Sequence, residues 1–189
     1  IISPVLKISY RDDVPLPEAK TLVLTSVHGL EGYLRLKGTA RKAYCVGKRT
    51  AQEARDNGFD VVVHEESLAL LEPVLQQIDP EDMLYVRGQH ATGDLTQKIK
   101  GLREVIVYDQ PAQPLSVEAQ NVLMGETAVI LPLFSPRCAA QFAKAGPFGA
   151  QIDMIAISQA ALDVCQDARV APYPNADGMI AAISQGLIA

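Results

Sequence analysis

Short apolar runs alternate along the chain with longer stretches of helical periodicity, a pattern typical of parallel strands joined by crossover helices. The predicted strands are Val5–Ser9, Thr21–Thr25, Ala43–Val46, Asp60–Val63, Met83–Val86, Glu104–Tyr108, Ala128–Phe134, Met154–Ile157 and Arg169–Ala171. The predicted helices are Val27–Leu36, Arg49–Asn57, Ser67–Ile78, Ala91–Lys100, Val117–Met124, Pro136–Lys144, Gln159–Asp167 and Ala176–Gly186. Strands as apolar as Ala128–Phe134 indicate burial on both faces. The sequence therefore predicts an α/β fold with helices on both sides of the sheet.

Internal similarity divides this pattern into two parts. LTSVHGLEGY (Leu24–Tyr33) aligns with FSPRCAAQF (Phe134–Phe142): each is the end of a strand, then a serine, then a helix with an aromatic residue seven positions after that serine. CVGKRTAQEA, from Cys45, aligns in the same way with AISQAALDVC, from Ala156. Like segments at a nearly fixed offset indicate duplicated units. We therefore predict two similar α/β domains rather than one sheet of nine strands.

The domain boundaries are predicted where prolines and polar residues interrupt the pattern, at Tyr108–Ser116 and at Ser9–Pro17. If the strand Val5–Ser9 belongs to the sheet of the second domain, the chain crosses between the domains twice. The prediction is then an inserted domain at residues 14–107, an outer domain made of residues 1–8 and 116–189, and connectors at residues 9–13 and 108–115.

Composition narrows the class of protein. The 189 residues are 48% hydrophobic, the formal charge is −5, and Trp and clusters of Lys or Arg are absent, which argues against a nucleic-acid surface. No run of about 18 apolar residues would span a bilayer, and the first residues do not read as a secretory signal, so we expect a cytoplasmic protein. Cys45, Cys138 and Cys165 are widely spaced and indicate neither a disulfide framework nor a zinc site.

Several predicted turns share one design, in which a strand ends, a small or hydroxyl residue follows, and a helix begins. Such turns present free backbone N–H groups and a positive helix end at the carboxyl edge of a sheet, where α/β folds bind ligands. They are Thr25-Ser26, Val46-Gly47, Arg87-Gly88, Phe134-Ser135-Pro136 and Ile157-Ser158. Each turn alone is also explained by helix capping, so only the set suggests an anion-binding site.

Other motifs do not carry a function. Gly47-Lys48-Arg49-Thr50 resembles a phosphate-binding loop, but Lys42 stands where that loop needs its first glycine. No Gly-x-Ser-x-Gly elbow surrounds Ser26 or Ser135, and the three histidines lack metal-ligand spacing. Each histidine is better explained as a solvent-facing residue or a local hydrogen-bonding partner.

The motifs taken in order resemble the uroporphyrinogen-III synthase family over nearly the whole chain. They are PVLKI (Pro4–Ile8), LVLTS (Leu22–Ser26), VGKRTAQEARDNGF (Val46–Phe59), LYVRG (Leu84–Gly88), VIVYDQP (Val105–Pro111) and FSPRCAAQF (Phe134–Phe142). The resemblance implies two flavodoxin-like domains, each a parallel sheet flanked by helices, joined by a two-stranded connector with the site between them. It implies a cofactor-free and metal-free monomer, with the preceding deaminase as a candidate partner.

The implied reaction closes the linear tetrapyrrole hydroxymethylbilane to uroporphyrinogen III, with loss of water and inversion of ring D. Tyr108 matches the family's crossover tyrosine and is our candidate proton donor to the leaving hydroxyl, because a phenol stays protonated at neutral pH. Its alternative role is structural, as a strand residue packed beneath the hinge. The residues expected to bind substrate carboxylates, directly or through their turns, are Ser26, Gly47, Thr50, Arg87, Gly88, Ser135 and Ser158.

The sequence departs from the family pattern in two places. The second domain has Ser158-Gln159-Ala160-Ala161 where the family often has further hydroxyl residues, and the family's first strand and helix are absent, which would expose a strand edge. Two other functions therefore stay open at this point. One is a two-domain protein that closes on a small anionic ligand without catalysis, and the other is an inactive domain that binds a partner.

Overall fold

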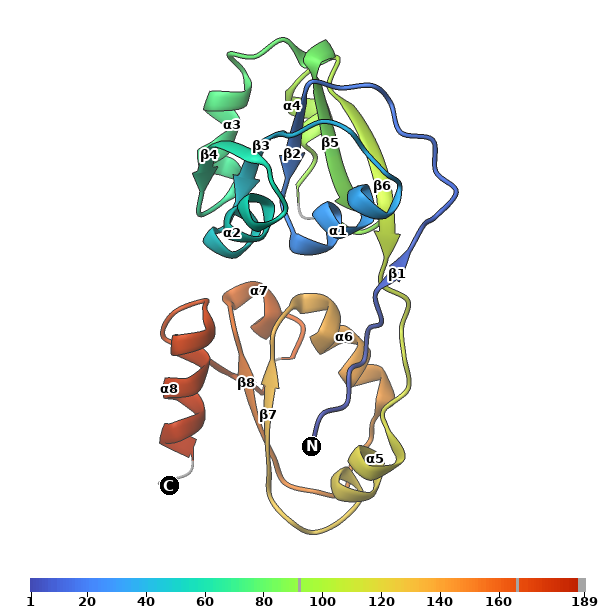
Figure 1. Cartoon of the computed structure of the whole chain (residues 1–189). Coiled ribbons are helices and arrows are strands. Elements are labelled where there is room, and N and C mark those ends of the chain that lie inside the picture. Colours follow the sequence, from blue (N-terminus) through green and yellow to red (C-terminus); the bar gives the residue numbers. More distant parts are fainter. Residues whose placement is uncertain (92, 166, 187–189) are drawn as a thin grey trace. The chain divides into compact units, whose positions relative to one another are not determined.

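The computed structural model describes residues 1–91, 93–165 and 167–186 (Figure 1). The chain divides into two compact units. The inserted unit is Ile8–Pro111, and the outer unit combines Ile1–Lys7 with the described residues of Ala112–Ala189. The chain leaves the outer unit after its first residues and returns to it a hundred residues later, so one unit interrupts the sequence of the other.

The inserted unit is built on a six-stranded mixed sheet with the order β1-β6-β5-β2-β3-β4. Its strands are β1 (Ser9–Tyr10), β2 (Thr21–Leu24), β3 (Lys42–Val46), β4 (Asp60–Glu65), β5 (Met83–Gly88) and β6 (Arg103–Asp109). All pairings are parallel except that of β1 with β6, where Ser9 pairs with Asp109 and Tyr10 with Tyr108. Counted from β2, the parallel strands have the order 3-2-1-4-5, whereas flavodoxin itself has the order 2-1-3-4-5.

Helices cover both faces of this sheet, as the apolar strands predicted. They are α1 (Val27–Arg35), α2 (Lys48–Asp56), α3 (Leu68–Leu75) and α4 (Leu95–Lys98), with a 3₁₀ turn, η1, at Pro80–Asp82. Leu22 and Leu24 of β2 pack in one core cluster with residues of α1 and α2, whereas Val23 packs in the opposite cluster with residues of α3 and α4. The whole of β2 is buried, which is why its sequence shows no alternation.

Helix α4 is shorter than the predicted Ala91–Lys100, and Thr92 within that range lies outside the described residues. Gly93 has a φ of 81°, outside the helical region, and Asp94 caps the helix by accepting a 3.2 Å hydrogen bond from the N–H of Gln97. A helix N-cap at Asp94 sets the first helical residue at Leu95. Periodicity alone did not locate this start.

The outer unit has a smaller, parallel sheet in the order β7-β8-β9. Its strands are β7 (Val129–Leu133), β8 (Ile152–Ala156) and β9 (Arg169–Val170), and its helices are α5 (Val117–Leu123), α6 (Pro136–Ala145), α7 (Gln159–Leu162) and α8 (Ala176–Gly186). Leu123 of α5 and Phe142 of α6 belong to one core cluster. Met179 of α8 packs with Ile155 in another. Helix α7 ends earlier than the predicted Gln159–Asp167, in which Gln166 lies outside the described residues.

The predicted strand Val5–Ser9 is wrong. Leu6 forms only an isolated antiparallel bridge with Ala112, and the strand that does form, β1, begins at Ser9 and joins the sheet of the inserted unit. Residues Ile1 to Val5 instead border an apolar cavity of about 650 Å³, whose other walls come from β7, α5 and α6. Among the described strands, β7 is therefore an edge strand, and one of its sides faces this cavity.

Candidate active site

The strand order in the sheet of the inserted unit reverses between β2 and β5. From β2 the chain builds β3 and β4 on one side, and it then returns to place β5 and β6 on the other. In open α/β sheets, ligands bind outside the carboxyl ends of the strands at such a switch point. The residues that follow β2 and end β5 and β6 are therefore the first candidates for a site.

Ser26 and Tyr108 meet at this edge. Ser26 caps α1, and its Oγ accepts a 3.0 Å hydrogen bond from the N–H of Gly29. The hydroxyl of Tyr108, near the end of β6, lies 3.1 Å from the same Oγ, and either oxygen can be the donor. Tyr108 is 7% exposed, whereas Ser26 is half-buried. The two hydroxyls therefore form a pair that can pass a proton from the interior to the edge of the sheet.

Two glycines make room for this pair. A Cβ at Gly88 would lie 2.5 Å from Cζ of Tyr108, so only glycine lets the phenol ring cross the end of β5. A Cβ at Gly32 would lie 2.5 Å from Cγ2 of Val107, so glycine also lets α1 pack closely on β6. The position of Tyr108 against Ser26 thus depends on two glycines, which have no side chain to fill this space.

A second polar cluster adjoins Tyr108 and was not foreseen from the sequence. The Tyr10 hydroxyl donates a hydrogen bond to Glu31 and lies 3.0 Å from Nδ1 of His28. The rings of Tyr10 and His28 lie 6.5 Å and 5.7 Å from that of Tyr108, measured between centroids. Burial, and then the hydrogen bond to Glu31, raise the pKa of Tyr10 well above its usual range. His28 and Glu31 have the i, i+3 spacing of one helix face, but the sequence offers no sign of their contact with Tyr10.

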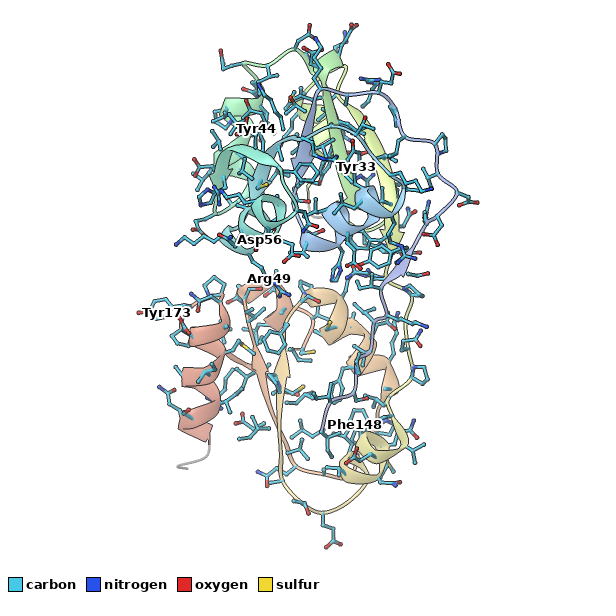
Figure 2. All side chains as sticks on the ribbon, viewed as in Figure 1. Tyr33, Tyr44, Arg49, Asp56, Phe148 and Tyr173 are labelled. Carbon is cyan, nitrogen blue, oxygen red and sulfur yellow. The ribbon has the colours of Figure 1, made fainter. Side chains whose placement is uncertain are left out.

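The turn after β3 offers mainly backbone groups. Gly47 caps α2 with a φ of 83°, a conformation that favours glycine, and its own N–H is donated to the carbonyl of Glu65 at 2.7 Å. Thr50 is only 5% exposed, so little of its hydroxyl reaches the surface. Lys48 forms an exposed ion pair with Glu66, and Arg49 lies in the same first turn of the helix (Figure 2).

Arg87 is occupied within the protein. Its guanidinium donates two hydrogen bonds of 2.8 Å to the carboxylate of Glu104 and one of 3.0 Å to the carbonyl of Gly88. Hydrogen bonding to Glu104 raises the pKa of Arg87, so this group stays charged. The contacts give Arg87 a clear part in holding the ends of β5 and β6 together.

The two serines predicted in the outer unit lie at one edge of its own sheet. Ser135 follows β7 and Ser158 follows β8, and these strands are parallel neighbours. Oγ of Ser135 accepts a 3.1 Å hydrogen bond from the N–H of Cys138, whereas Ser158 makes no such side-chain cap. The structure thus gathers Ser26, Gly47, Gly88 and Tyr108 at one carboxyl edge, and Ser135 and Ser158 at another.

Neither a metal site nor a membrane span is found in the described part of the chain. Across residues 1–91, 93–165 and 167–186, no three His, Cys, Asp or Glu residues cluster as metal ligands. None of the helices described in these ranges is both long and apolar enough to cross a bilayer.

Comparison with known proteins gives one family. The family model described as uroporphyrinogen-III synthase HemD matches residues 1–181. A crystal structure of uroporphyrinogen-III synthetase from Helicobacter pylori is similar, with a TM-score of 0.74, 18% identity and coverage of 97% of this chain and 91% of that one. A mutant uroporphyrinogen III synthase from Thermus thermophilus aligns with a TM-score of 0.56 and 12% identity, covering 97% and 87% of the two chains. No curated protein sequence matches significantly.

Proposed function

Because the chain belongs to the uroporphyrinogen-III synthase HemD family, we propose that the carboxyl edge of the inserted unit's sheet holds hydroxymethylbilane while Tyr108 and Ser26 help its hydroxyl to leave. The activity is that of uroporphyrinogen-III synthase, a hydro-lyase. The substrate is a linear tetrapyrrole with eight carboxylates, and the product is a ring in which ring D is inverted.

Binding fits the chemistry of this edge. Carboxylates are stabilised by backbone N–H groups and positive helix ends, and α1 and α2 both begin where β2 and β3 end. The substrate-binding residues proposed in the inserted unit are Ser26, Gly47, Thr50, Arg87 and Gly88. Their contacts support different parts in this proposal: the turns at Ser26 and Gly47 present helix N-termini, whereas Arg87 and Gly88 hold the strand ends in place.

The observation that carries the catalytic proposal is the 3.1 Å contact between the hydroxyls of Tyr108 and Ser26. When the C–O bond of the hydroxymethyl group breaks, the departing oxygen needs a proton to leave as water. Tyr108 can donate to Ser26, and Ser26 can then donate its own proton to that oxygen. Hydroxymethylbilane left alone closes without inversion. The remaining rate acceleration in this proposal therefore comes from positioning the substrate for the inverted closure.

The outer unit contributes Ser135 and Ser158 to the same substrate in this proposal, with segments 9–13 and 108–115 as the connectors of an inserted domain. Ser158 has a hydroxyl that caps no backbone N–H, which leaves it available to a carboxylate. The preceding deaminase is a candidate partner, since direct transfer would limit spontaneous closure of the substrate.

The test is the rate at which Tyr108→Phe forms uroporphyrinogen III from freshly made hydroxymethylbilane, with isomers I and III separated by chromatography. We expect the rate of isomer III formation to fall at least about 10²-fold, as for loss of a general acid. Tyr44→Phe is the matched control, because Tyr44 packs with the cluster on the opposite face of the same sheet (Figure 2).

An unchanged rate in Tyr108→Phe would contradict the proton-donor role and leave the structural role of this ring. Isomer I alone, formed by the unaltered protein at the spontaneous rate, would instead favour the anion-binding alternative without catalysis. Both outcomes are read from the same chromatogram.

A further inference from the structure

The polar cluster beside Tyr108 has a defined direction of hydrogen bonding. Tyr10 has one hydroxyl proton, and this proton is donated to Glu31. The contact of 3.0 Å between the Tyr10 oxygen and Nδ1 of His28 can then be a hydrogen bond only if Nδ1 carries a proton and donates it. In the neutral imidazole, the other nitrogen, Nε2, is left as an acceptor.

The surrounding contacts hold this arrangement in place. Cζ of Arg35 lies over the ring of Tyr10, 4.9 Å from its centroid, and Nε of Arg35 donates a 3.1 Å hydrogen bond to Asp12. Burial and Glu31 keep Tyr10 protonated, because both raise its pKa. Tyr10 therefore acts as a fixed link between the carboxylate and the imidazole rather than as a group that ionises.

Nε2 of His28 is available to a ligand. The side chain of His28 is 43% exposed, and within the described part of the chain no protein atom bonds this nitrogen. His28 is the second residue of α1, and its ring lies edge-on to Tyr108 with 5.7 Å between centroids. An acceptor thus stands beside the hydroxyl pair that we propose to be the acid.

The substrate needs such an acceptor. Helix N-termini and hydroxyls suit its carboxylates, but its pyrrole N–H groups are donors. As the hydroxyl leaves, positive charge spreads into the pyrrole ring that carried it, and the N–H of that ring becomes a stronger donor. A hydrogen bond that strengthens in the transition state accelerates the reaction rather than merely tightening binding.

We propose that Nε2 of His28 accepts a hydrogen bond from the pyrrole N–H of the ring that loses the hydroxyl, and that Tyr10 and Glu31 hold His28 in the required tautomer. The inference rests on the proposed site at Tyr108 and Ser26. His28 contacts the substrate, whereas Tyr10 and Glu31 are positioning residues that act through His28.

The first test needs no substrate. In protein labelled with ¹⁵N-histidine, the imidazole ¹⁵N shifts of His28, assigned by their loss in His28→Ala, report which nitrogen bears the proton at a pH where the ring is neutral. We expect Nδ1–H in the unaltered protein and a shift towards Nε2–H in Tyr10→Phe, which lacks the acceptor. An Nε2–H tautomer in the unaltered protein would overturn the inference.

The second test is kinetic. His28→Ala should lower kcat for isomer III about 10-fold with little change in KM, as for one lost hydrogen bond to the transition state. His64→Ala in β4 is the control and should match the unaltered enzyme. An unchanged kcat in His28→Ala would overturn the inference even if Tyr108→Phe is slow, whereas a slow His28→Ala beside an unaffected Tyr108→Phe would overturn only the acid role of Tyr108.

Discussion

The turns at Ser26 and Ser135 are nearly the same in local structure and differ in what lies beside them. Both serines have extended backbones, with φ of −158° and −165°, and both accept a cap hydrogen bond, of 3.0 Å and 3.1 Å. Oγ of Ser26 also meets Tyr108, which is 82 residues away in the sequence. A strand, a serine and a helix therefore make only a capped turn, and a distant residue adds the chemistry.

The sheets behind these turns differ as well. In the inserted unit, helices seal both faces, and Leu84 of β5 is fully buried. In the outer unit, Leu133 of β7 is also buried, at 4% exposed, but it borders the 650 Å³ cavity. This contrast between the two sheets should appear most strongly in the free energy of unfolding.

Leu84→Ala should cost about 4 kcal/mol, and Leu133→Ala about 2 kcal/mol, within the range for large-to-small changes in cores. Leu84 is surrounded by packed neighbours, whereas Leu133 already lacks them on its cavity side. Urea denaturation of both variants measures the difference. Burial raises the pKa of the Cys45 thiol to about 11. Cys45 should therefore react with thiol reagents only after the inserted unit opens. Its reactivity thus reports when the inserted unit unfolds. Equal costs would show that the cavity walls pack as tightly as the sealed sheet.

Gly88→Ala should cost about 1–2 kcal/mol, because the new Cβ would meet the Tyr108 ring at 2.5 Å and the ring must move. Movement of the ring breaks its contact with Ser26, so formation of isomer III should slow as well. Gly125→Ala in the outer unit is the control, since its nearest neighbours would lie 3.4 Å away or farther. Full activity in Gly88→Ala would mean that the position of the ring is not needed.

Ser26→Ala and Ser135→Ala should each cost about 1 kcal/mol, the usual effect of losing an N-cap. Their activities should differ, because only Ser26→Ala removes the hydrogen-bonding partner of Tyr108. Thermal unfolding and the isomer III assay on the same samples separate the two effects. Equal activity losses would remove the distinction between the turns.

The smallest effect concerns Asp153, whose pKa is lowered by its hydrogen bonds to Arg169 in the outer unit. Since the folded pKa lies below the unfolded value of about 3.9, the pair stabilises the fold above that pH and loses its contribution as the pH falls through the folded pKa. The side chains are 38% and 41% exposed, so we expect about 0.5 kcal/mol at most. The free energy of unfolding of Asp153→Asn, measured from pH 7 down to about pH 3, should depend slightly less on pH than that of the unaltered protein. A stronger dependence on pH would contradict the predicted direction.

Patterns within one element predicted much of the fold. The buried run Thr21–Leu24 and the helix after Ser26 were found because their signals lie in neighbouring residues. The strand Val5–Ser9 was misplaced because its apolar residues could not say which partner they would meet. The strand order was not predicted, since it depends on packing between elements that are far apart in the sequence.

The candidate site shows the same limit. Ser26, Gly47 and Gly88 were predicted because each lies at the end of a strand or just after it in the sequence. Tyr10 was missed because its importance comes from the antiparallel pairing with Tyr108, and His28 because its partner is Tyr10. Arg87 was predicted as a substrate ligand, but no sequence pattern indicated that Glu104 already holds it.

The interrupted sequence of the outer unit affects how this protein folds while the ribosome is making it. Ile1–Lys7 leave the ribosome about a hundred residues before Ala112 and the residues after it, a delay of roughly 5–20 s at ordinary translation rates. Once Asp109 has emerged, the inserted unit has its whole sequence and can bring Ser9 and Asp109 side by side while the rest of the outer unit is still being made. The loop that joins Leu6 to Ala112 is then closed in advance, so its entropy no longer opposes that bridge. Folding of the inserted unit thereby favours completion of the outer unit, and a nascent chain whose inserted unit does not fold must close this loop at its full entropic cost.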